Sequence, residues 1–120
     1  MSTFPPLNHV AVTVRDLSVS TPWYTTLLGV EPIADEDSGD GFHHAVWALP
    51  GGTMFGLHAH TQPAAVEEFS EFNVGLDHIA FGCQSREELE KWAARLTELG
   101  IEHGEIVDRA YGSDISHGCI

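Results

Sequence analysis

The chain has 120 residues, 42% of them hydrophobic, and its five Lys and Arg against 18 Asp and Glu give a formal net charge of −13 at pH 7. That length suits one domain with a modest core, and the negative charge argues against nucleic acid and anionic membranes as partners. No apolar run approaches the about 20 residues of a membrane-spanning helix, and MSTFPPLN has neither the basic start nor the apolar run of a signal peptide, so we expect a cytoplasmic protein.

Residues 7–14, LNHVAVTV, have the alternation of a β-strand. Because side chains alternate across a strand, three valines share one face, and the other face carries His9, Ala11 and Thr13. The valine face is apolar, and we expect it to pack against a helix. The other face is small and polar, and it holds an imidazole.

A helix follows this strand, and its start can lie anywhere from Leu17 to Pro22. Asp16 can cap a first turn, but proline is favoured at the first position of a helix, which Thr21 would then cap. Gly29 ends the helix in either case, because glycine is favoured just after the last helical turn.

Strand-like sequence dominates the next segment. We expect a short strand around residues 30–34 and then an acidic turn region, ADEDSGDG. Longer strand-like runs lie at 42–49 and 53–60, and the Pro-Gly-Gly between them is typical of a hairpin turn. Residues 61–75 are typical of a loop. The first 60 residues therefore predict a β-α-β-β-β unit.

The chain then repeats itself. Residues 76–83, LDHIAFGC, match residues 7–14 position for position, which places His78 in register with His9 at a shift of 69 residues. The same shift superimposes Trp92 on the tryptophan of the first helix. Two copies of one unit are present.

The second copy contains the best-marked helix. Ser85 and Glu88 have the spacing of a capping box, apolar residues recur at helical intervals up to Leu99, and Gly100 suits the position after the last turn. A further alignment sets His117 against a histidine of the first unit, so we expect the last strand of the second unit to be missing.

The predicted fold is therefore of the α+β class, with two βαβββ repeats in a single domain of residues 1–120. We expect repeat one at about 5–60, a linker at about 61–75 and repeat two at about 76–120. The two cysteines are too few and too far apart for a disulfide scaffold or a zinc knuckle.

Histidines gather on one predicted face. If the valine face packs on the helix, His9 points to the opposite side of the sheet, and the repeat gives His78 the equivalent place. On the strand at 53–60, the same reasoning leaves His58 and His60 on the open face. Neutral imidazoles are the commonest metal ligands, although a lone strand histidine is more often a hydrogen-bonded structural residue. The repetition favours a metal site at His9 and His78.

The paired units resemble the vicinal oxygen chelate superfamily, through the first strands LNHVAVTV and LDHIAFGC and the helix ends TTLLGVEP and TELGIEH. That superfamily holds glyoxalase I, fosfomycin-resistance enzymes, extradiol dioxygenases, methylmalonyl-coenzyme A epimerase and bleomycin-resistance proteins. The resemblance covers essentially the whole chain and implies a cupped mixed β-sheet. It does not select a reaction, because the superfamily supports several chemistries on one scaffold.

The resemblance also implies a site. The family takes one metal-binding His from the first strand of each unit, which falls on His9 and His78, and a Glu from the last strand of the second unit, which lies beyond Ile120. Glyoxalase-like members add a carboxylate where this chain has Gly56, which disfavours a four-ligand glyoxalase I. Two imidazoles and a carboxylate suit a divalent ion such as Fe, Mn, Zn or Ni.

The leading hypothesis is a small metalloenzyme of lyase, isomerase or dioxygenase type, whose ion binds neighbouring oxygens of a small organic substrate. His58 and Tyr111 are the candidate catalytic residues, for proton transfer or for orienting the substrate. The alternative is a metal-free small-molecule binding protein of the bleomycin-resistance kind, with Phe42 and Trp47 for stacking. A homodimer is expected, because such cups often close across a subunit interface.

Overall fold

The computed structural model describes residues 3–111 and 115–119. The chain forms two compact units, Met1–Phe69 and Ser70–Ile120, and each is described by itself. None of the described helices has the length and hydrophobicity that crossing a bilayer requires.

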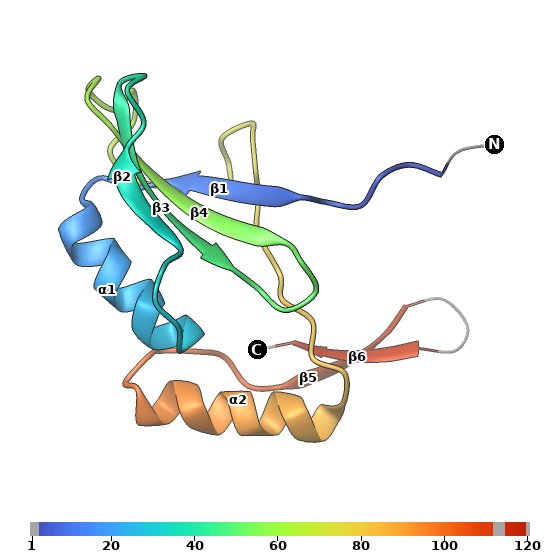
Figure 1. The fold of residues 1–120 in the computed structure, drawn as a ribbon. Helices are drawn as coiled ribbons and strands as arrows, with labels where there is room; N and C mark the ends of the chain where they lie inside the picture. Colours follow the sequence, from blue (N-terminus) through green and yellow to red (C-terminus); the bar gives the residue numbers. More distant parts are fainter. Residues whose placement is uncertain (1–2, 112–114, 120) are drawn as a thin grey trace. The chain divides into compact units, whose positions relative to one another are not determined.

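The first unit is a mixed four-stranded sheet with one helix against one of its faces (Figure 1). Its elements are β1 (His9–Thr13), α1 (Leu17–Leu28), β2 (Ala34–Asp37), β3 (Phe42–Ala48) and β4 (Met54–His60). The strand order is β1-β4-β3-β2, with β1 parallel to β4 and the other neighbours antiparallel. The predicted β-α-β-β-β unit is therefore present.

The core of this unit lies between the sheet and α1. Trp47, Phe55 and Leu57 are at most 2% exposed, and they point from β3 and β4 toward the helix. Tyr24 of α1 meets them, with its ring centroid 5.1 Å from that of Phe55 and 6.2 Å from that of Trp47. Full burial of one such side chain stabilises a fold by about 1.5–3 kcal/mol. No described helix of the first unit covers the opposite face of the sheet, which is called the open face below.

Helix α1 uses the earlier of its two possible starts. Asp16 is the cap, and its side chain accepts hydrogen bonds from the Ser18 hydroxyl at 2.6 Å and the Ser18 N–H at 2.9 Å. These two bonds lower the pKa of the Asp16 carboxyl. Pro22 consequently lies inside the helix, and Gly29 ends it with a φ of 74°.

Strand β2 corrects the sequence prediction, which placed a strand around residues 30–34. Pro32 has no N–H to give to a ladder, and the antiparallel register with β3 begins only at Ala34. The first half of the acidic segment predicted as a turn, residues 34–37, is the strand instead, and its carboxylates lie beside the histidines of β3, whereas residues 38–41 are not part of a strand. Cross-strand pairs of this kind override the low strand propensity of acidic residues.

The second unit comprises α2 (Arg86–Glu98), β5 (Val107–Tyr111) and β6 (Ile115–Cys119), with β5 and β6 paired antiparallel. The predicted capping of α2 is confirmed. The Ser85 side chain accepts the N–H of Glu88, and the Glu88 carboxylate accepts the N–H of Gln84 at 2.6 Å. Gly100 follows the last turn with a φ of 72°.

Residues 76–83 form no strand in the part of the chain that the structure describes, which corrects the prediction for this segment. The equivalent strand of the first unit, β1, pairs with β4 alone. The described residues of the second unit include no counterpart of β4. Since a strand needs a neighbour to pair its N–H and C=O groups, the alternating pattern of 76–83 is not sufficient to form one.

Candidate functional site

Three strands bring histidines to the open face of the first unit. His58 of β4 lies directly opposite His44 of β3 and also opposite Thr13 of β1, while His44 lies opposite Glu36 of β2. Residues directly opposite one another point to the same side of a sheet. These four residues therefore form one cross-strand row on the open face. His9 lies on the same face, four residues before Thr13 on β1.

His58 is half-buried and lies among other rings. Its ring stacks on Phe42 with a centroid distance of 4.3 Å and an interplanar angle of 9°. The rings of His44 and His60 lie 5.8 and 6.0 Å away. Burial lowers the pKa of His58, and the charges of His44, His60 and His9 lower it further. A neutral imidazole can accept a proton, which general base catalysis requires.

His44 has a carboxylate partner. Its Nε2 lies 3.4 Å from Oε1 of Glu36, which is longer than a well-formed hydrogen bond. On the other face of the same strands, Nε2 of His43 donates to Oδ1 of Asp35 at 2.7 Å. Neither pair was predicted from the sequence. The sequence offered one indication, because two adjacent histidines follow an acidic segment. When two such segments pair as strands, adjacent residues point to opposite faces, so one His–carboxylate pair lies on each face.

His9 and His78 share a local arrangement. Nδ1 of His9 donates to Oδ1 of Asn8 at 2.7 Å, and Nδ1 of His78 donates to Oδ1 of Asp77 at 2.6 Å. An amide or carboxylate oxygen only accepts, so Nδ1 is the donor in both contacts, and Nε2 carries the lone pair when the ring is neutral. Histidines that bind metal commonly donate their other ring N–H to such an oxygen. The residue preceding each histidine therefore prepares its Nε2 to act as a ligand.

The predicted site residues lie in different parts of the structure. His9 and His58 share the open face of the first unit, and His78 belongs to the second unit. Tyr111 ends β5 opposite Ile115, and its side chain lies outside the described residues. Among the side chains that are described, no group of three or more His, Cys, Asp or Glu is arranged to hold a metal ion. A shared ion at His9 and His78 stays a prediction.

Two aromatic residues that the alternative hypothesis used for ligand stacking have other partners. Trp47 is fully buried in the core, and Phe42 stacks on His58. Gly56 lies on the open face between the row and the His9 end of the sheet. A Cβ added there would come no closer than 3.6 Å to Ala11 or to the backbone, so sterics do not require glycine at this position.

Comparison with known families decides the wider relationship. The family model described as Glyoxalase/Bleomycin resistance protein/Dioxygenase superfamily matches residues 6–117. The chain belongs to this superfamily. The α+β fold class and the superfamily predicted from the repeated strands are thereby confirmed. The comparison with curated proteins found no match.

Solved structures of the superfamily agree with the fold. A glyoxylase/bleomycin resistance protein/dioxygenase domain from Frankia sp. EAN1pec is 31% identical, with a TM-score of 0.77, and the match covers 92% of this chain and 85% of that one. A mutant of the fosfomycin resistance protein FosX from Listeria monocytogenes, in complex with Mn(II) and 1S,2S-dihydroxypropylphosphonic acid, is 20% identical, with a TM-score of 0.57 and coverage of 98% and 85%. The second similarity concerns the fold alone.

Proposed function

We propose that this superfamily member is a small metal-dependent enzyme of lyase, isomerase or dioxygenase type, acting on a small organic molecule with neighbouring oxygens. His9 and His78 would hold its divalent ion. The observation that supports the proposal is the same local hydrogen bond at both histidines, in which Nδ1 contacts the side chain of the preceding residue.

The donor set fits such an ion. Two imidazoles with lone pairs on Nε2 suit Fe, Mn, Zn or Ni, and the Mn(II) in the FosX complex is an example of a divalent metal on this fold. When bound, a divalent ion supplies Lewis-acid polarisation of substrate oxygens. The net charge of −13 favours the accumulation of cations near the protein.

Side chains of the protein would carry out proton transfer. His58 has the properties of a general base, because its lowered pKa keeps it neutral near pH 7 and the stack on Phe42 fixes its ring. It would take a proton from the substrate and return it later. Tyr111 is proposed as a second group that donates a proton or orients the substrate. We further propose that both units form one domain and that two copies of the chain form a homodimer.

Metal content tests the proposal. Purified protein should contain a stoichiometric divalent ion, and His9→Ala should lose it. His43→Ala is the matched control, because His43 lies on the other face of the sheet and bonds to Asp35. Metal retained by His9→Ala would contradict the assignment. A metal-free protein that binds an organic ligand tightly would favour the binding-protein alternative.

A further inference from the structure

The turn between β2 and β3 contains the dipeptide Asp40–Gly41, and the sequence has no other Asp–Gly step and no Asn–Gly step. Glycine is favoured in such turns because it adopts a positive φ without strain, and Gly41 has a φ of 92°. Both residues are exposed. Asp–Gly is also the step at which an aspartate rearranges most readily, because glycine has no side chain to hinder attack by its own backbone nitrogen.

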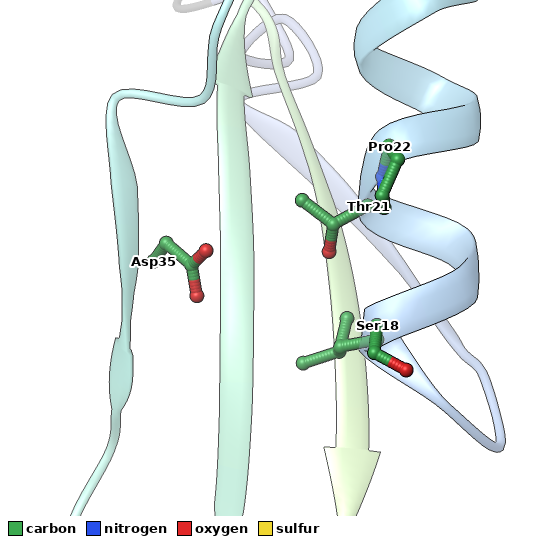
Figure 2. A pocket seen from close by; sticks show the side chains of 5 residues that line it. Ser18, Thr21, Pro22 and Asp35 are labelled. Carbon is green, nitrogen blue, oxygen red and sulfur yellow. The ribbon is translucent and has the colours of Figure 1, made fainter.

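The aspartates of this acidic segment differ in what holds them. Asp35 accepts a hydrogen bond from His43 at 2.7 Å, and it lies across a pocket of about 300 Å³ from helix α1 (Figure 2). Asp37 accepts the N–H of Gly39 at 2.7 Å. The Asp40 side chain has no such partner among the described residues. Its carboxyl group is therefore free to turn toward the backbone.

The backbone nitrogen that would attack this carboxyl group is also free. The N–H of Gly41 donates to no described residue, whereas the carbonyl of Gly41 accepts from the N–H and the hydroxyl of Thr61 at 2.9 and 3.1 Å. The N–H of Asp40 donates to the Ser38 hydroxyl at 3.0 Å. The groups around the reacting pair are thus held in hydrogen bonds, and the two reacting groups have no competing partner.

We propose that Asp40 is a site of spontaneous isoaspartate formation in the folded protein. The Gly41 nitrogen attacks the carbon of the protonated Asp40 side-chain carboxyl group, a C–N bond closes a succinimide ring, and one water is lost. One water then opens the ring. Opening at the main-chain carbonyl gives isoaspartate, in which the chain runs through the former side-chain carbon, and opening at the other carbonyl returns aspartate. The reaction needs no oxidant, metal or cofactor, so it is independent of the proposed metal site.

The rearrangement also affects the open face. Isoaspartate adds one methylene group to the main chain of the turn, immediately before Phe42 is reached. The Phe42 carbonyl accepts the N–H of Ser38 at 2.9 Å across this turn, and the Phe42 ring stacks on His58. A longer turn changes the path between Ser38 and Phe42, so the stack on His58 should loosen in the converted protein.

Ageing of the purified full chain tests the proposal. The protein is kept for several weeks at neutral pH and physiological temperature. Isoaspartate is measured by methyl transfer from labelled S-adenosylmethionine with an isoaspartyl methyltransferase, and it is located by fragmentation mass spectrometry. It should accumulate at residue 40 and not at residue 37, whose carboxylate is bound to the N–H of Gly39.

Three variants sharpen the result. Asp40→Glu should abolish the signal, because attack would have to form a larger and less favourable ring. Asp37→Glu is the matched control in the same segment, and its signal should equal that of the parent. Asp40→Asn should convert faster than the parent, because an amide reacts more readily than an ionised carboxylate, and each conversion appears as a mass gain. NMR spectra recorded before ageing report whether each variant is folded.

Four results would overturn the proposal. They are an aged parent without isoaspartate at residue 40, equal amounts at residues 37 and 40, loss of the signal in Asp37→Glu, and isoaspartate confined to an unfolded fraction. In the folded converted protein, the Cε1–H resonance of His58 should move, whereas the methyl resonances of Leu57 on the other face should not. An unmoved His58 resonance would refute the effect on the open face.

Discussion

The stack of Phe42 on His58 gives the most detailed prediction. Phe42→Ala removes a ring that lies 4.3 Å from the imidazole in a nearly parallel plane. Burial is the largest cause of the lowered pKa of His58, so exposing the ring should raise its pKa toward the ordinary value of 6.5. NMR titration of the His58 Cε1–H resonance measures this shift. Phe42→Leu, which keeps most of the cover, should shift the pKa less.

The same substitution should destabilise the fold at neutral pH. Phe42 is half-buried, so about half of the 1.5–3 kcal/mol for a fully buried side chain is lost. The stacked pair contributes about 0.5–1.5 kcal/mol more. The free energy of unfolding at pH 8 should therefore fall by about 1–3 kcal/mol, as measured by urea denaturation.

The loss should shrink in acid. His58 has a lower pKa folded than unfolded, so above the unfolded pKa neither state is protonated and the histidine has no effect on stability. As the pH falls through about 6.5, the unfolded state takes up a proton first, and the parent protein is destabilised. Phe42→Ala reduces this penalty. A difference in stability that is the same at pH 8 and pH 5, with an unchanged His58 pKa, would refute the assigned cause.

Four further substitutions test other parts of the structure. Gly56→Glu should fold, because a Cβ there meets only ordinary contacts at 3.6 Å. The added carboxylate should raise the affinity for the metal ion in a chelator competition, and an unchanged affinity would mean that the ion binds elsewhere. Asn8→Ala and Asp77→Ala should each weaken metal binding by about 10- to 100-fold in the same competition, as expected when a group that orients a metal ligand is lost. An affinity equal to that of the parent protein would remove the support for His9 and His78 as metal ligands. Leu57→Ala should cost about 2–5 kcal/mol in urea denaturation, because this side chain is fully buried; a cost under about 1 kcal/mol would mean that the core is elsewhere.

Local patterns predicted much of the fold. The hairpin of β3 and β4 and helix α2 follow from alternation, a Pro-Gly-Gly turn and a capping box, all of which act over a few residues. Strand β2 was misplaced, because its acidic sequence pairs with His43 and His44 of another strand, and strand propensity does not include such pairs. The strand prediction for residues 76–83 was wrong for a related reason, since a strand forms only beside another strand with which its backbone can pair.

The open face was predictable only in part. Alternation along β1 and β4 correctly placed His9, His58 and His60 on the side away from the helix. It could not show that Phe42 would stack on His58, or that Glu36 would lie beside His44, because these contacts depend on the register between strands. A shift of one residue in register would send each side chain to the other face.

His9 and His78 are proposed to bind one metal ion through Nε2. Titration of ¹⁵N-histidine-labelled protein with Zn(II) tests it most directly. The Nε2 resonances of both residues should shift together and saturate at the same metal ratio, while both Nδ1 atoms stay protonated. Shifts of only one ring, saturation at different ratios, or binding through Nδ1 would contradict it.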